Sequence, residues 1–506
     1  MRKLAFAGAF LSLGACLAVA KPISITFVHS NDLHAHIEPT IIRKKAYGGY
    51  ARMMTAIKQV KEKEKNVVLL NAGDTFQGTL YFNVYEGLAD VAMLNAMGYQ
   101  AMTLGNHEFD RGPAPLSVFA QNAQFPVLSS NIDFSGEPLL KDLVKPSTVL
   151  TVDGEKIGVV GCTVEDTPNI SNPGPTLKFF MARDRVQAEV DRLTRQGINK
   201  IIVLSHIGYG EDKDLAKQLR DVDLIIGGHT HTPLGTPDLD GWPKAGGAYP
   251  TIVRNPQNVD VPVVQSWEWG KVLGKIRLEF DAAGRVRRIA EAKAMVLDES
   301  IPEDPSLKAM VAGYKKPLEA MQNAPIGEAG AAMERGSNAK VTSPMGCFIS
   351  DAMLDATSAM GAQVALMNHG GVRSALEPGK ITYGIAISVQ PFNNTLHLID
   401  LTGKELMTAF EQAVAKGGLI PSRGVKIEMR EGKVVSATLN GEAIDPSKTY
   451  RVCVPSFLAG GGDGVFALRD AKGRRVDTGL MDIDVLVEQI KKKSPIKPAN
   501  ELRVKN

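Results

Sequence analysis

The stretch Thr103–Gly112, with the sequence TLGNHEFDRG, concentrates side chains that can bind a metal ion or transfer a proton. Between Asn106 and Asp110 it holds an amide, an imidazole and two carboxylates. Burying so many polar groups costs several kcal/mol unless each is paired or bound to metal. The stretch is therefore either a polar surface turn or the centre of an active site.

Four more polar stretches favour the active site. Each follows a short run of β-branched or aliphatic residues, just as Asn106 and its neighbours follow the apolar Ala101-Met102. The stretches are Asn31–His34, Ala72–Thr75, Ser205–His206 and Gly227–His231, and the runs before them are Ile25–Val28, Val67–Leu70, Ile201–Leu204 and Leu224–Ile226. The pattern predicts a strand followed by a ligand-bearing loop, repeated along the chain.

In α/β sheets, sites form where loops leave the carboxyl ends of strands, so these loops can converge. The side chains that would converge are Asp32, His34, Asp74, Asn106, His206, His229 and His231. This mixed oxygen and nitrogen set suits Zn or Mn, and also Fe or Co, better than Ca or Mg, which prefer oxygen alone. The set is too large for one ion, so we expect two divalent ions that share a bridging carboxylate.

The motifs DxH, GD, GNHE, H and GHxH resemble those of the calcineurin-like metallophosphoesterases. From about residue 23 to its C-terminus the chain is similar to the 5'-nucleotidase family, which includes ecto-5'-nucleotidase and the periplasmic UDP-sugar hydrolases. The similarity is carried by stretches such as GDTFQGTLYFNVYEG at 73–87 and SIPEDPS at 300–306. The resemblance implies an α/β fold, with a four-layer metallophosphoesterase domain followed by a C-terminal α/β substrate-binding domain.

The resemblance also implies how the metal ligands divide. One ion would take Asp32, His34, Asp74 and His231, and the other Asp74, Asn106, His206 and His229, so that Asp74 is the bridge. The family varies at the position of His231. Two adjacent ions can lower the pKa of a shared water and hold phosphoryl oxygens for in-line attack.

His107 and Asp110 remain outside the metal ligands and are three residues apart, so one turn can set the carboxylate against the imidazole. A carboxylate partner fixes the tautomer and raises the pKa of the ring. His107 would then stabilise the transition state or protonate the leaving alkoxide. The alternative is a hydrogen-bonded pair that only holds the loop.

Two phenylalanines of the second half of the chain lie in loop-like settings, Phe392 in QPFNN and Phe457 in PSFLAGGGDG. The glycines after Phe457 permit close approach of the backbone to a ligand. In the family, matching phenylalanines clamp the nucleobase, and an aspartate six residues after the second binds the ribose. Phe457 and Asp463 have that spacing, and we expect Asn394 of the QPFNN loop to contact substrate as well.

The stretch Asn368–Arg373, NHGGVR, resembles the NGGGIR loop of the family, which implies a base contact by Asn368 and a phosphate contact by Arg373. Three departures concern the same region. Lys340 is the nearest basic residue to a position where the family usually has arginine, and His369 and Asn393 replace glycines. These departures bear on substrate preference and on the phosphate clamp, not on the metal chemistry.

At 506 residues the chain exceeds what one core usually supports. The near balance of 58 basic and 55 acidic residues gives no indication of a nucleic-acid polymer or a membrane surface as partner. We expect a signal peptide at 1–20, the di-metal domain at 21–302, a linker helix at 303–324 that begins at Pro305, and the nucleotide-binding domain at 325–506.

The N-terminus is typical of an export signal, with Arg2 and Lys3 before the apolar Leu4–Val19 and a small-x-small cleavage site at Ala18–Ala20. Cleavage there predicts a periplasmic or secreted protein without a transmembrane segment. The alternative treats Leu13-Gly14-Ala15-Cys16 as a lipobox, which would leave a lipid anchor on Cys16. The mature chain would keep three cysteines, enough for at most one disulfide.

Together these features predict an exported metal-dependent 5'-nucleotidase that hydrolyses nucleoside 5'-monophosphates to nucleoside and phosphate. The alternatives with the same metal site are a 2',3'-cyclic-nucleotide phosphodiesterase with 3'-nucleotidase activity, and a UDP-sugar or nucleoside polyphosphate hydrolase. An alternative of another class is a non-catalytic nucleotide-binding surface protein. His107 and Asp110 argue against it, because metal binding requires neither.

Overall fold

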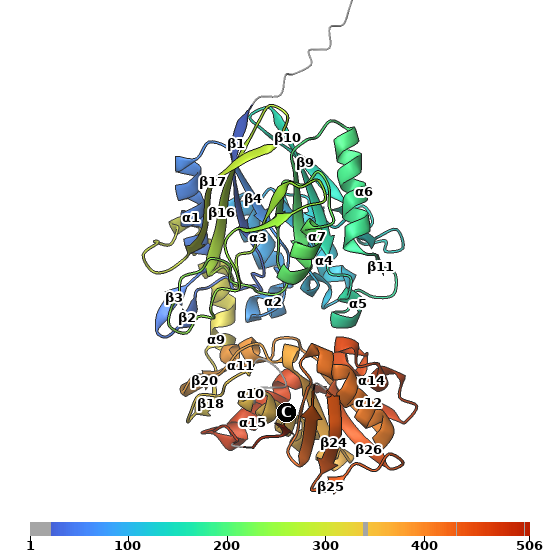
Figure 1. The fold of residues 1–506 in the computed structure, drawn as a ribbon. Coiled ribbons are helices and arrows are strands. Elements are labelled where there is room, and N and C mark those ends of the chain that lie inside the picture. Colours follow the sequence, from blue (N-terminus) through green and yellow to red (C-terminus); the bar gives the residue numbers. More distant parts are fainter. Residues whose placement is uncertain (1–21, 337–342, 432, 500, 506) are drawn as a thin grey trace, which may run out of the picture.

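The computed structural model describes residues 22–336, 343–431, 433–499 and 501–505, which form two α/β domains stacked end to end (Figure 1). The expected signal peptide, Cys16 and Lys340 lie outside these residues. No helix in the described part of the chain is long and apolar enough to cross a membrane.

The first domain contains two large sheets, each with parallel strands at its centre. The seven-stranded sheet has the order β17-β16-β1-β4-β5-β6-β8 and the six-stranded sheet the order β14-β15-β13-β12-β10-β9. In chain order the strands of the first sheet are β1 (Ile23–Ser30), β4 (Val67–Asn71), β5 (Ala101–Thr103), β6 (Val127–Leu128), β8 (Val144–Lys145), β16 (Val272–Phe280) and β17 (Val286–Val296). Those of the second are β9 (Ser147–Val152), β10 (Glu155–Thr163), β12 (Ile201–His206), β13 (Leu224–Ile226), β14 (Thr251–Arg254) and β15 (Asp260–Val264).

These strands are apolar on both faces because both faces are covered. Phe27 and Leu70 of the first sheet pack against Ile202 and Leu204 of the second, in one buried core. The intervening residues of the strands face helices, which are α1 (Tyr50–Lys63), α3 (Leu88–Met97) and α4 (Pro113–Asn122) on the first sheet and α6 (Ala182–Arg195) and α7 (Tyr209–Ala216) on the second. The domain thus has four layers, which confirms the predicted fold class.

The strands predicted before the polar loops are those observed, β1, β4, β5, β12 and β13. Neighbouring pairs among them run parallel, β1 with β4, β4 with β5, and β12 with β13. Their carboxyl ends therefore open at one edge of the domain, which faces the second domain (Figure 1).

The helix predicted from Pro305 is interrupted. Helix α8 (Pro305–Lys315) begins with Asp304 as its N-cap, whose side chain accepts from the N–H groups of Ser306 and Leu307. A 3₁₀ turn at Lys316–Leu318 then separates α8 from α9 (Glu319–Gln322). Pro317 explains the break, because it has no N–H to continue the α-helical hydrogen bonds.

The second domain is built on a five-stranded sheet of order β22-β19-β26-β21-β27. The strands are β19 (Val364–Asn368), β21 (Thr395–Thr402), β22 (Leu419–Pro421), β26 (Thr449–Pro455) and β27 (Arg475–Met481). Helices α10 (Pro344–Thr357), α11 (Tyr383–Val389) and α15 (Asp482–Lys493) cover one face, and α12 (Gly403–Ala413) and α14 (Phe466–Asp470) the other. Smaller sheets are formed by β18 (Pro325–Ala329) with β20 (Gly379–Thr382) and by β25 (Glu442–Ala443), β24 (Lys433–Leu439), β23 (Val425–Arg430) and β28 (Val504–Lys505).

One edge of this sheet gathers the loops with the predicted substrate residues. Strands β19 and β26 run parallel, so Asn368 and Pro455 end them at the same edge. Strand β21 runs antiparallel to β26 and pairs its Leu396 with Pro455, so it begins where the other two end. The segments with Phe392 and Phe457 are neighbours for this reason.

Candidate active site

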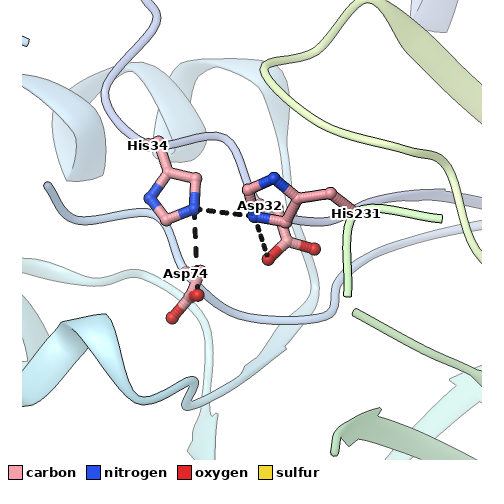
Figure 2. A group of neighbouring side chains, drawn as sticks. All are labelled: Asp32, His34, Asp74 and His231. Carbon is pink, nitrogen blue, oxygen red and sulfur yellow. Dashed lines mark hydrogen bonds and ion pairs between the residues drawn. The ribbon is translucent and has the colours of Figure 1, made fainter. Parts of the chain in front are cut away.

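The loops after β1, β4 and β13, together with His206 at the end of β12, bring the predicted metal ligands into two overlapping groups. Asp32, His34, Asp74 and His231 form the first group, shown in Figure 2, and Asp74, His206 and His229 form the second. Within each group the potential ligand atoms all lie within 4.8 Å of one another. Asp74 belongs to both groups, as a bridging ligand must.

The imidazoles of the first group present their Nε2 atoms to each other. Nδ1 of His34 donates to the carbonyl of Phe76 at 2.9 Å, and Nδ1 of His231 donates to Glu268 Oε2 at 2.5 Å. The two Nε2 atoms are 3.1 Å apart, and that of His231 lies 3.2 Å from Asp32 Oδ1 (Figure 2). A proton on one of the two Nε2 atoms would satisfy this contact, and a metal ion bound by both atoms would replace that proton.

The second group repeats the arrangement with greater burial. His206 is fully buried and donates its Nδ1 proton to the carbonyl of Ala72 at 2.6 Å. Its Nε2 faces Asp74 Oδ2 at 3.0 Å. Asn106, 2% exposed, has a buried Oδ1 without a hydrogen-bond partner among the described residues. A metal ion would satisfy both atoms, so the residues present fit two divalent cations.

Glycines let the backbone approach these ligands closely. A Cβ on Gly105 would lie 2.2 Å from Asp74 Oδ1, and one on Gly228 would lie 2.8 Å from His206 Nδ1. Glycine is therefore required by space in the GNHE and GGH motifs.

The ligand loops adopt a backbone conformation that side chains rarely take. The residues with positive φ include Asp32, His34, Asp74, His229 and His231, with φ between 47° and 79°. Such conformations cost free energy and persist where the surroundings enforce them, which is common at functional sites. The buried Glu108 supplies one such constraint, since its carboxylate accepts from the backbone N–H groups of Asp74, Thr75, Phe76 and Gly105.

Positive charge is favoured among these groups. Burial would raise the pKa of Asp74, yet the neighbouring imidazoles, led by that of His206, hold it well below its usual range. Burial would likewise lower the pKa of His206, but the carboxylates of Asp74 and Asp32 raise it to about 10. Protons supply this charge in the metal-free protein, and a divalent cation would supply it in their place.

His107 and Asp110 form the predicted pair. Nδ1 of His107 donates to Asp110 Oδ2 at 2.6 Å, which leaves Nε2 for another partner. Burial would lower the pKa of His107, but the carboxylates of Asp110 and Asp74 raise it above its ordinary value. The ring of His107 stacks beside that of Phe392 from the second domain, with 5.7 Å between centroids.

A single cavity of about 700 Å³ lies between the domains and joins the two sets of predicted residues. From the first domain it is lined by His107, Asp110 and four of the metal-group residues, Asp74, Asn106, His229 and His231. From the second domain it is lined by all the predicted substrate residues, Asn368, Arg373, Phe392, Asn394, Phe457 and Asp463. Its volume is that of a small-molecule site.

Hydrogen bonds organise the loops of the second domain. Asn368 Nδ2 donates to Asp463 Oδ2 at 2.7 Å. The side chain of Asn394 is engaged at both ends, because its Oδ1 accepts from the N–H of Phe457 at 3.1 Å and its Nδ2 donates to Asp482 at 3.1 Å. Asn394 therefore fixes the loop that carries Phe457 in addition to lining the cavity.

Comparison with known proteins agrees with this architecture. Family models for the calcineurin-like phosphoesterases and for the C-terminal domain of 5'-nucleotidases match residues 25–233 and 322–470. The human 5'-nucleotidase is 36% identical over 537 residues, which cover 98% of this chain and 93% of the relative. The chain belongs to the 5'-nucleotidase family.

One solved structure and one further relative are also similar to this chain. The crystal structure of a 5'-nucleotidase precursor from Thermus thermophilus superimposes with a TM-score of 0.92 and 42% identity, covering 96% of this chain and 99% of that one. The trifunctional nucleotide phosphoesterase protein YfkN of Bacillus subtilis is 36% identical over 95% of this chain, which spans 35% of its length. Family membership and the two His/Asp groups together indicate divalent metal ions.

Three residues that contact the site were not predicted from the sequence. Glu108 lies within NHEFD, but no motif indicated that it would hold the backbone of the ligand loops. Glu268, which orients His231, follows β15 between two tryptophans and also forms an ion pair of 2.6 Å with Lys271. Ser171 donates to Asp110 Oδ1 at 2.7 Å.

The three cysteines of the described residues are free and buried.

Proposed function

We propose that the protein is an exported, metal-dependent 5'-nucleotidase that hydrolyses nucleoside 5'-monophosphates to nucleoside and phosphate. One observation carries the proposal. The same cavity is lined by the metal groups and the His107–Asp110 pair on one side and by Phe392, Phe457 and Asp463 on the other. A nucleotide is the ligand that needs both a phosphoryl site and a base site.

In this proposal the metal ligands are Asp32, His34, Asp74, Asn106, His206, His229 and His231, and the ions are Zn or Mn. When bound, two such ions lower the pKa of a shared water and neutralise phosphoryl oxygens. Asp74 serves both groups, and Glu268 orients the ring of His231 by accepting from Nδ1, so that Nε2 faces Asp32 and His34.

The remaining residues orient the substrate and handle its charge. Asp110 holds the Nδ1 proton of His107, so that Nε2 points its charge or proton at the leaving ribose oxygen. Arg373 can bind phosphate oxygens through its forked donors. Phe392 and Phe457 would stack on the base, and Asp463 would accept from the ribose hydroxyls.

A second substrate class has specific support. The Bacillus subtilis relative is described as a trifunctional nucleotide phosphoesterase, and His369 and Lys340 depart from the family pattern near the phosphate clamp. A 3'-nucleotidase or cyclic-nucleotide phosphodiesterase activity, or hydrolysis of UDP-sugars or nucleoside polyphosphates, would use the same metal groups.

Export is proposed from the first twenty residues, with cleavage after Ala20. The mass of the mature N-terminal peptide tests it, since a diacylglycerol-modified peptide that begins at Cys16 would establish the lipid-anchored alternative.

The activity is tested by phosphate release from 5'-AMP, 3'-AMP, 2',3'-cyclic AMP, ADP, ATP and UDP-glucose, with and without Mn or Zn. We expect 5'-AMP to be preferred and its turnover to disappear with chelator. Preference for 3' or cyclic substrates would support the second class instead.

A His107→Ala variant separates a catalyst from a binding protein. We expect its kcat to fall by about 10²- to 10⁴-fold, the usual contribution of general acid–base catalysis. Metal content should stay as in the wild type, because the structure places His107 in neither metal group, and adenosine should still bind, because Phe457 and Asp463 are unchanged. No turnover of any substrate by the metal-loaded wild type would leave a nucleotide-binding protein as the better account.

A further inference from the structure

The Asp110 carboxylate is held from two sides. Its Oδ2 accepts from His107 Nδ1 at 2.6 Å, and its Oδ1 accepts from the hydroxyl of Ser171 at 2.7 Å. With both oxygens engaged, the carboxylate cannot rotate without breaking one of these hydrogen bonds. Ser171 is separated from Asp110 by 61 positions, so the contact is a product of the tertiary fold.

Ser171 belongs to a short segment that follows β10 and contains the single-turn helix α5 (Thr167–Ile170). The buried Thr167 fixes this segment, because its hydroxyl donates to the carbonyl of Val164 at 2.6 Å and its carbonyl accepts from the N–H of Ser171 at 2.9 Å. The side chain of Ser171 is thereby aimed at Asp110.

The same segment touches the second domain. Asp166 Oδ2 forms an ion pair of 2.8 Å with Lys416 Nζ, and α5 packs against the 3₁₀ turn Gly462–Gly464, which includes Asp463. Ser171 and Lys416 both line the interdomain cavity. One short segment therefore connects the catalytic pair of the first domain with the substrate loops of the second.

A hydrogen bond that only stabilises the fold would be an alternative role for Ser171. The partial exposure of the pair favours a role in orienting it. The side chains of His107 and Asp110 are 13% and 10% exposed, so water can reach the pair and satisfy Asp110 without fixing its orientation. A serine hydroxyl held by a structured turn fixes the orientation as well. Small displacements of a catalytic group can cost about 10²-fold in rate.

We infer that Ser171 is a positioning residue for His107 and Asp110, and that contact between Asp166 and Lys416 of the second domain holds Ser171 in place. This inference rests on the proposed function, in which His107 acts on the leaving group. It adds that the orientation of His107 and Asp110 depends on contact between the two domains.

The test compares kcat and KM of Ser171→Ala and Ser171→Thr with the wild type, using the best substrate of the panel. We expect Ser171→Ala to lower kcat roughly 10- to 100-fold with little change in KM, as for other residues that orient a catalytic group. The threonine hydroxyl should restore most of kcat. Ser300→Ala is a matched control, because Ser300 makes a similar bond of 2.6 Å to Asp298 on the surface.

The link to the second domain is tested by a double-mutant cycle. Lys416→Gln should lower kcat in the wild-type background and have little further effect in Ser171→Ala, since both changes act on the same segment. Lys217→Gln is its control, because Lys217 forms a comparable exposed ion pair of 2.8 Å with Asp214. Additive losses would overturn the link between the domains.

A readout that does not depend on turnover separates failure of this inference from failure of the proposed function. The Nδ1 proton of His107 should give a downfield NMR resonance that Ser171→Ala shifts or broadens and Ser300→Ala leaves unchanged. Wild-type kcat in Ser171→Ala, a loss confined to KM, or an unchanged resonance would each overturn the positioning role. A wild type that hydrolyses no nucleotide overturns the proposed function alone.

Discussion

The two sides of the interdomain cavity are built differently. On the first-domain side, Asp32 and His206 are fully buried, the ligand loops contain residues in left-handed backbone conformations, and Glu108 holds the loop that carries Asp74. On the second-domain side, Phe392 and Phe457 are half-buried and lie on loops at the edge of a sheet. The metal side is enclosed and its loops are held by internal hydrogen bonds, whereas the base side offers partly exposed aromatic rings.

This difference bears on the departures from the family pattern that the sequence suggests. Few other residues can replace a metal ligand, because the donor atom, the charge and the length of the side chain must all suit the ion. An aromatic ring can stack on a base whichever residues lie beside it in its loop. Asn393, for example, replaces a glycine in the family pattern and has a φ of 54°, a conformation that asparagine accepts more readily than most residues. We therefore expect the chemistry to be fixed on the metal side and the specificity to be tuned on the base side.

The largest effect should follow from Asp74→Asn, which removes the charge shared by both metal groups and keeps the side-chain shape. We expect turnover to fall at least about 10³-fold, more than the loss of a single electrostatic donor costs, and the metal content to fall with it. Metal analysis and phosphate release measure the two quantities.

If the two sides are independent, Asp74→Asn should still bind adenosine with the wild-type affinity, measured by calorimetry with the metal-free wild type as the control. Loss of adenosine binding together with the metal would contradict the independence of the two sides.

The strands and loops of the metal side could be predicted from the sequence because their signals are local. Each ligand loop follows a short run of apolar residues, and the ligand types appear within a few positions of the strand end. The pattern of strands and loops predicted that the ligands converge, whereas the four-layer fold and the grouping of the ligands around Asp74 came from the resemblance to the family. The break at Pro317 was not predicted, although proline cannot continue the hydrogen bonds of an α-helix.

The supporting residues could not be predicted, because they act over long separations. Glu268 is 37 positions from His231, and Ser171 is 61 positions from Asp110. The residues next to them in the sequence do not indicate these contacts, although Glu268 lies between two tryptophans. Their contacts depend on how β15 and the segment after β10 are placed by the packed sheets, which a pattern of residue types does not contain.

A smaller effect is expected from Phe457→Ala, which acts on the base side alone. Loss of one aromatic stacking surface should weaken nucleoside binding by about 1–3 kcal/mol, raising KM and leaving kcat nearly unchanged. Steady-state kinetics with 5'-AMP measure both. Phe466→Ala is a control, since Phe466 stacks on the exposed Arg469 away from the cavity lining. A loss confined to kcat would show that Phe457 does not act by binding the base.

The smallest effect should come from Glu268→Gln, which changes only the residue behind a metal ligand. The amide oxygen of glutamine can still accept from His231 Nδ1, so we expect metal affinity to fall by about tenfold, the low end of the range for residues that orient ligands. Excess metal should restore turnover, unlike in Asp74→Asn.

The change also removes the charged partner of the buried Lys271, whose Nζ lies 3.6 Å from the ring centroid of Trp267. The double variant Glu268→Gln/Lys271→Met removes that uncompensated charge and separates fold stability from metal affinity. Weakened affinity in both variants, read by competition with a chelating dye, would place the effect at His231. Recovery of full affinity in the double variant would place it in the packing around Lys271.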